Sequence, residues 1–199
     1  MTRRVRLRLI TGRIITDLPV ALGALVIAFF GGILIGRHLP PASAAASGAA
    51  MIHYAPAENL EHLDVALIDQ AGTKIDLAGY VLTDVAVIEA LTRAADRGVA
   101  IRIYLYEGQL LDHGRPYEAL QELRATPGVE IRVKPASTPL MHLKSYAIDG
   151  RLLRSGAANF SASGLKRQDN DLIILESAEA AAAFKRNFEA IWANGGGHG

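Results

Sequence analysis

The first half of the folded region alternates between helical and extended patterns of apolar residues. A helical stripe comes first and ends at Gly72, with apolar positions at Leu60, Leu63, Leu67 and Ile68. The apolar run from Ile75 to Leu82 is then typical of a buried strand. The folded domain is expected to begin near Ile52, because the preceding residues lack hydrophobic periodicity.

A second helix and strand follow directly. Thr83 or Asp84 can cap the helix and Gly98 can end it, and its core-facing residues are Val85, Ile88, Leu91 and Ala95. Residues 99–106 then alternate as a strand. Two strands joined by a helix of this length predict a parallel pair with a right-handed crossover.

The second half of the chain supplies the remaining elements. We expect a helix near residues 117–125, a short strand at 129–133 and a strand in the apolar run 172–175, which suits a central position covered on both faces. The last helix, about 178–192, would bury Phe184, Phe188, Ile191 and Trp192. This order predicts an α/β fold, a mixed β-sheet flanked by helices on both faces.

The segment from His142 to Gly150 combines strand periodicity with reactive side chains. On a strand, alternate residues share a face, so the imidazole of His142 and the ammonium of Lys144 would lie side by side with Tyr146 and Ile148. Asp149-Gly150 predicts a two-residue hairpin and a return strand over residues 151–155.

A loop of small residues follows this hairpin. Gly156, Ala157, Ala158 and Asn159 would lie beside the His142 strand. Their backbone N–H groups and the Asn159 amide could hold an anion.

These residues resemble the signature of the phospholipase D superfamily. The pattern is His142-x-Lys144 with Asp149 five residues later, then Gly156-x-x-Asn159, with Ala157 where the family often has serine. The likeness extends over roughly residues 56–193. It implies an α-β-α sandwich that cleaves phosphodiesters through a phosphohistidine, without a metal or other cofactor.

The resemblance also implies a partner. Its two-step chemistry needs two imidazoles: one attacks phosphorus, and the other protonates the leaving oxygen and later activates water. The chain has one His-x-Lys motif and no internal repeat. We therefore expect a homodimer in which His142, Lys144 and Asn159 from both chains surround one phosphate.

Further site residues follow from the same resemblance. Small single-motif members carry an acidic residue where Asp169 stands, and this residue would fix the His142 tautomer by a hydrogen bond or cap the next strand. Asp149 is a catalytic candidate within the motif, but an aspartate before glycine in a turn is ordinarily structural, so organising the hairpin is the favoured alternative. Candidate substrate-binding residues are Gly156, Ser161 and Lys166, although Ser161 could instead cap the segment after Phe160.

Charge distribution bears on the substrate. Residues 132–167 hold seven basic residues against the single acid Asp149: Arg132, Lys134, Lys144, Arg151, Arg154, Lys166 and Arg167. A local basic field favours an anionic substrate. The leading hypothesis is a non-specific endonuclease on DNA or RNA. A phospholipase D acting on phosphatidyl headgroups is the alternative, and a non-catalytic binding module is a third possibility that the complete motif disfavours.

The region before the folded domain resembles a membrane-targeting leader. Residues 1–17 hold five arginines against one acid, and residues 18–36 carry no charge over a length that can cross a bilayer. The arginines should stay cytoplasmic, which places the domain on the exported side, periplasmic or secreted. Small residues at 41–44 offer a cleavage site, so both a retained transmembrane anchor and a cleaved signal peptide fit.

The expected organisation is therefore a basic segment at 1–17, a hydrophobic segment at 18–37, a linker rich in alanine, serine and proline at 38–51, and a catalytic domain at 52–195. The chain contains no cysteine, which excludes disulfides, thiolate catalysis and cysteine-ligated zinc.

Overall fold

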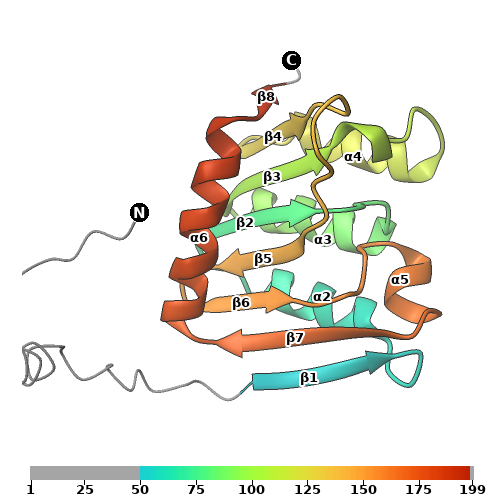
Figure 1. Ribbon diagram of the computed structural model, residues 1–199, viewed down its shortest axis with the longest axis vertical. Helices are drawn as coiled ribbons and strands as arrows, with labels where there is room; N and C mark the ends of the chain where they lie inside the picture. The colour runs from blue at the N-terminus through green and yellow to red at the C-terminus, as the bar shows by residue number, and fades with distance from the viewer. Residues whose placement is uncertain (1–49, 198–199) are drawn as a thin grey trace, which may run out of the picture. The chain divides into compact units, whose positions relative to one another are not determined.

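A computed structural model describes residues 50–197, which form one mixed sheet with the strand order β1-β7-β6-β5-β2-β3-β4-β8 (Figure 1). The strands are β1 (Ala50–Ala55), β2 (Lys74–Gly79), β3 (Ala100–Tyr106), β4 (Val129–Lys134), β5 (Lys144–Ile148), β6 (Leu152–Ser155), β7 (Asn170–Glu176) and β8 (Gly196–Gly197). The parallel pair β2–β3 joined by a helix was predicted from the sequence and is confirmed.

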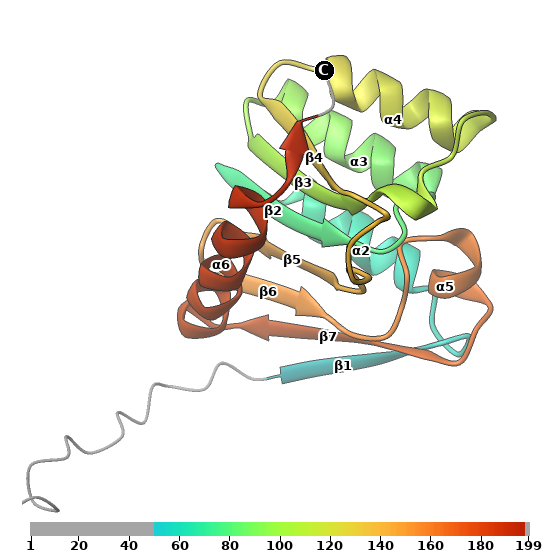
Figure 2. The ribbon, with the colours of Figure 1, turned by 45° about the horizontal axis from the view of Figure 1, so that its top comes forward.

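Helices cover both faces of the sheet (Figure 2). One face carries α2 (Leu60–Asp69), α3 (Val85–Asp96) and α4 (Arg115–Ala125), whereas α6 (Ala178–Ala193) crosses the other face. The predicted fold class is thereby confirmed. Two short helices, η1 (Glu107–Gln109) and α5 (Ala162–Lys166), lie in the connections.

The alternation of side chains along β5 explains the two cores. Tyr146 and Ile148 pack in the larger core under α2 and α3, and Ala147 packs with Phe188 and Trp192 beneath α6. The predicted apolar face of the last helix is confirmed for Phe184, Phe188 and Trp192, and Ile191 is half-buried.

One end of the sheet collects the segments that carry the signature residues. Gly79 at the end of β2 pairs with Lys144 at the start of β5, while β6 ends at Ser155 and β7 begins at Asn170. β1, β3 and β4 also finish at this end. We call it the site end of the sheet.

Several sequence expectations need correction. The strand β5 begins at Lys144, so His142 lies just before it. The hairpin connection contains Arg151 as well as Asp149 and Gly150, because Ile148 pairs with Leu152. The run 172–175 is not in a central strand covered on both faces: α6 packs over β6, β5 and β2, and leaves Ile173 and Leu175 of β7 half-buried.

The expected leader lies outside the described residues. Among residues 50–197, no helix has the length and apolar character needed to cross a membrane. Strand β1 was not expected from the sequence, and its first two residues, Ala50 and Met51, fall in the stretch assigned to the linker.

Candidate active site

His142 and Lys144 meet at the site end of the sheet. The ammonium nitrogen of Lys144 lies 2.9 Å from Nδ1 and 3.1 Å from Nε2 of the imidazole, and donates to the backbone oxygen of His142 at 2.8 Å. Because an ammonium group only donates, the ring nitrogen that accepts from it must carry a lone pair. His142 is exposed, whereas Lys144 is buried, and burial lowers the pKa of Lys144.

Tyr80 supports this pair and was not identified from the sequence. Its ring centroid lies 4.5 Å from that of His142, and the Lys144 ammonium lies 5.1 Å from the Tyr80 centroid. The backbone N–H of Tyr80 donates to the oxygen of Leu143 at 2.8 Å, which ties the segment before β5 to the end of β2. The sequence placed Tyr80 inside the expected strand 75–82, whereas β2 ends at Gly79 and leaves Tyr80 at the site end.

The loop from Gly156 to Asn159 is held by β7 and α5. Gly156 has a φ of +139°, and a Cβ atom there would lie 2.5 Å from the backbone oxygen of Asp171. The carboxylate of Asp171 accepts from the N–H of Ala157 at 2.9 Å. These contacts explain why glycine is required and why the loop takes one position against β7.

Asn159 brings an amide to this loop. Its side-chain oxygen is buried without a hydrogen-bond partner. A buried unsatisfied amide is costly, and it is a group that a bound ligand can satisfy. Asn159 was predicted from the sequence and lies on the same end of the sheet as His142 and Lys144.

Asp149 lies in the expected hairpin, away from the other signature residues. It lies in the hairpin at the opposite end of β5, where its carboxylate accepts from the N–H groups of Gly72, Thr73 and Lys74 and from the Thr73 hydroxyl at 2.8–2.9 Å. Partial burial opposes ionisation, but these hydrogen bonds outweigh it and lower the pKa of Asp149 to about 2. These contacts favour the structural role that the sequence also offered for Asp149, since its carboxylate joins the hairpin to β2.

Lys166 and Ser161 also have structural partners. Lys166 forms ion pairs with Glu61 and Asp84, the latter at 3.7 Å, and its contact with Glu61 raises the pKa of the lysine. The Ser161 hydroxyl accepts from the N–H of Gly164 at 3.1 Å and so caps α5. For Ser161 this is the capping alternative given from the sequence, whereas Lys166, a candidate for substrate binding, is engaged by two carboxylates.

Asp169 is exposed in the turn before β7. Within residues 50–197, no hydrogen bond joins it to His142, although such a contact was expected. It instead borders a surface groove with Ile52, Tyr54 and Asp171.

The basic run seen in the sequence is dispersed in three dimensions. The Arg132 guanidinium donates to the oxygen of Trp192, Arg151 lies in the hairpin at the far end, and Arg154 is fully buried in an ion pair with Asp64. With Lys166 paired as well, the basic residues left at the site end are Lys134, Lys144 and Arg167. The positive field at the site end is therefore weaker than the seven basic residues of the run 132–167 suggest.

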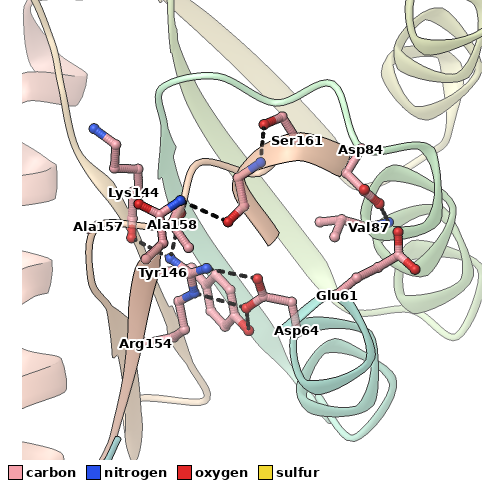
Figure 3. A network of polar contacts seen from close by, with 12 residues as sticks. Glu61, Asp64, Asp84, Val87, Lys144, Tyr146, Arg154, Ala157, Ala158 and Ser161 are labelled. Atoms are coloured by element: carbon pink, nitrogen blue, oxygen red, sulfur yellow. Dashed lines mark hydrogen bonds and ion pairs between the residues drawn. The ribbon is translucent and has the colours of Figure 1, made fainter. Parts of the chain in front are cut away.

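A buried polar network adjoins the site and was also missed. The Asp64 carboxylate accepts from Tyr146 and Arg154, and Arg154 also donates to the backbone oxygens of Lys144 and Ala158 (Figure 3). Asp64 occupies the buried face of α2 between Leu60 and Ile68, at helical spacing. A charged residue at an apolar position was the signal in the sequence.

Comparison with known proteins defines the family. Residues 65–192 match the family described as cardiolipin synthase, PLD-like domain, and the chain belongs to this family. The mitochondrial cardiolipin hydrolase of Drosophila melanogaster is 34% identical over 145 residues, covering 63% of this chain and 55% of that protein. A phospholipase D of Rickettsia conorii is 33% identical over 122 residues, covering 61% and 58%. The chain thus spans a little over half the length of these relatives.

Solved structures support the same fold. Nuc from Salmonella typhimurium, described as a phospholipase D family member, superposes with a TM-score of 0.69 at 21% identity and covers 75% of this chain and 97% of its own. NucT from Helicobacter pylori gives a TM-score of 0.66 at 19% identity, covering 75% and 99%. The phospholipase D-like fold expected from the sequence is confirmed.

Proposed function

We propose that this domain hydrolyses phosphodiesters through covalent transfer to His142. The observation that carries the proposal is a single nitrogen of Arg154 that donates to the backbone oxygens of Lys144 and Ala158, at 2.8 and 3.3 Å. It joins the Lys144 strand, with its imidazole contact, to the loop that ends in Asn159. An imidazole, an ammonium and an amide are thereby available to one phosphate group.

The reaction has two balanced steps. In the first, a ring nitrogen of His142 bonds to phosphorus, the bond to the leaving oxygen breaks, and a second imidazole gives that oxygen a proton. In the second, this imidazole takes a proton from water, whose oxygen bonds to phosphorus as the phosphorus–nitrogen bond breaks. The Lys144 ammonium would move from the imidazole to a phosphate oxygen and stabilise the negative charge of each transition state.

The second imidazole would come from His142 of the partner subunit. The exposure of His142 at the open site end leaves room for such an approach, and the chain has one His-x-Lys motif. A two-fold axis through the site would also double the number of lysines around the phosphate.

Phospholipids are the first candidate substrate, ahead of the nucleic acids favoured by the sequence. Exposed apolar side chains flank the site end, with Tyr54 56%, Leu111 44% and Leu140 52% exposed. Such side chains suit contact with a lipid surface. The names of the relatives, cardiolipin hydrolase and phospholipase D, favour the same class.

Nucleic acid is the second candidate. The open position of His142, with Lys134 and Arg167 at the same end, suits a phosphate backbone. The dispersal of the other basic residues places this substrate second.

The test compares both classes in EDTA. The full-length protein in detergent micelles is assayed on cardiolipin, phosphatidylcholine, plasmid DNA and RNA, with the His142→Asn variant as control. We expect lipid hydrolysis that persists in EDTA and disappears in the variant. Cleavage of DNA or RNA alone would show that nucleic acid, and not phospholipid, is the substrate. Loss of all activity in EDTA with recovery in magnesium would contradict the mechanism.

The proposed location is the exported side of the cytoplasmic membrane, reached through the segment 18–36. In a bacterial host expressing the full chain, protease added to intact spheroplasts should degrade the domain. Degradation only after lysis would contradict this location.

A further inference from the structure

A buried ion pair lies beneath the candidate site. The side chains of Asp64 on α2 and Arg154 on β6 are both 0% exposed. Nε of Arg154 donates to one carboxylate oxygen at 2.9 Å and Nη2 to the other at 2.8 Å, and the Tyr146 hydroxyl donates to the first at 2.8 Å (Figure 3). Three donors on one carboxylate meet the condition for keeping two charges in an apolar interior.

The remaining guanidinium nitrogen binds the main chain of the site. Nη1 donates to the oxygens of Lys144 and Ala158. Lys144 carries the ammonium that contacts His142, and Ala158 directly precedes Asn159. One nitrogen therefore bridges the two backbone segments that hold the candidate groups.

This contact lies where β5 and β6 separate. The oxygen of Leu143 accepts from Tyr80 on the β2 side, so the next carbonyl, that of Lys144, faces the β6 side. The pairing of β5 with β6 ends at Tyr146 and Arg154. The guanidinium thus binds a carbonyl that lies beyond the last pair of the ladder, at the point where the chain leaves β6 to form the Asn159 loop.

The guanidinium is fixed in orientation by its surroundings. Its central carbon lies 4.5 Å from the centroid of the Phe160 ring, on the residue after Asn159. The oxygen of Phe160 in turn accepts from the N–H groups of Thr83 and Asp84 at 2.8 and 2.9 Å. The planar group is therefore held on its edge by Asp64 and on its face by Phe160.

We propose that Arg154, oriented by Asp64 and Tyr146, is a positioning residue that holds Lys144 and Asn159 at the spacing needed to bind one phosphate. This inference rests on the proposed function. Arg154 is buried beneath the site and acts through the backbone of the two segments, so its removal should reduce kcat more than it changes KM.

The decisive variant removes both charges from the full-length protein. Replacing a buried ion pair by apolar residues of similar size often leaves stability unchanged or raises it, so Asp64→Leu with Arg154→Met should remain folded when Tyr146→Phe also removes the hydroxyl that donated to Asp64. We expect kcat on bis(p-nitrophenyl) phosphate to fall about 100-fold, the effect of a small misplacement of reacting groups. The thermal unfolding midpoint reports whether the fold is retained.

A matched pair on the opposite face of the sheet serves as control. Arg102 binds Asp76 at 2.7 Å beneath α6 and also pairs with Glu189 at 2.6 Å, and within residues 50–197 it contacts neither Lys144 nor the Asn159 loop. Asp76→Leu with Arg102→Met should leave kcat at the wild-type value while removing an ion pair from the same sheet. A drop equal to that of the first pair would show a general effect of the substitution and overturn the inference.

Coupling to Lys144 separates positioning from a purely structural role. If Arg154 acts through Lys144 and Asn159, the paired substitution should cost much less in a Lys144→Ala background than in the wild type. Full additivity, or a folded paired variant with wild-type kcat, would overturn the inference.

If the paired variant does not fold, the Arg154→Lys variant is the deciding test. A kcat reduced at least about 10-fold supports positioning, and an unchanged kcat contradicts it.

The outcome remains separable from the proposed function. A wild-type protein inactive on every phosphodiester would refute the function itself. An active wild type with an equally active paired variant would refute only the role of Arg154.

Discussion

Gly164 on α5 packs directly against the backbone of Asn159, because a Cβ atom at residue 164 would lie 2.6 Å from the oxygen of Asn159. The short helix α5 therefore fixes the loop that carries the candidate amide. Two contacts hold α5 in place: Ser161 caps its N-terminus, and Lys166 forms an ion pair with Glu61.

Gly164→Ala should displace the Asn159 loop. We expect kcat to fall by one to two orders of magnitude, roughly, whereas stability should drop by no more than about 2 kcal/mol, because alanine is the better helix former. Steady-state kinetics and thermal unfolding measure the two effects. Gly196→Ala is the control, since its Cβ atom would approach no closer than 4.0 Å to Val133. Wild-type kinetics for Gly164→Ala would contradict this role of α5.

Gly156→Ala should be more disruptive. Its φ of +139° disfavours any residue with a Cβ atom, and the added atom would lie 2.5 Å from the backbone oxygen of Asp171. We expect loss of about 2 kcal/mol or more in the free energy of unfolding, together with loss of activity. Denaturant unfolding measures the change, and a fully stable, active variant would contradict the contact between this loop and β7.

Asp149 should govern stability in acid without affecting catalysis at neutral pH. Its pKa is lowered to about 2 in the folded state, so its contribution is complete above its ordinary value near 4 and is lost as the pH falls towards 2. Asp149→Asn keeps the backbone geometry, since asparagine tolerates the φ of +53°. It should lower the free energy of unfolding by about 1–2 kcal/mol at pH 7, after allowance for solvent screening, and flatten its dependence on pH below 4.

Urea titrations between pH 2 and pH 7 test this prediction, with Glu130→Gln on the exposed side of β4 as a control for removing one carboxylate. A neutral-pH kcat reduced as far as that of a His142 variant would instead return Asp149 to the reaction.

Lys144 should set the alkaline limb of the activity profile. Burial lowers the pKa of Lys144, so the ammonium needed to stabilise phosphate charge is lost at a lower pH than for an ordinary lysine. Lys144→Arg should reduce kcat yet move the alkaline limb upward, because arginine stays protonated. Lys144→Ala should lower kcat by about 100-fold or more. Profiles of kcat/KM against pH that coincide in wild type and Lys144→Arg would contradict this assignment.

The sequence predicted most strands of the sheet and its principal helices, because regular periodicity is a local signal, and a compact motif singled out His142, Lys144 and Asn159 as candidates. The roles of Asp149 and Lys166 were not local. Each forms contacts with residues far away in the chain, Asp149 with Gly72 to Lys74 and Lys166 with Glu61.

The buried network shows the same limitation more clearly. In the sequence, Arg154 is one member of a basic run and Asp64 is one of many acidic residues. The structure pairs them between α2 and β6, which removes both charges from the surface. A count of charges along the chain therefore overestimated the basic field at the site.

The shared site is the central claim, and mixing chains tests it most directly. Full-length wild type and His142→Asn are combined at equal concentrations and allowed to exchange subunits, which under two-fold statistics places about half of the wild-type chains in mixed dimers. If both His142 imidazoles serve one phosphate, mixed dimers are inactive and the mixture retains about half of the activity of its wild-type chains. Retention of the full activity after exchange, or full activity from a monomer in light scattering, would contradict the shared site.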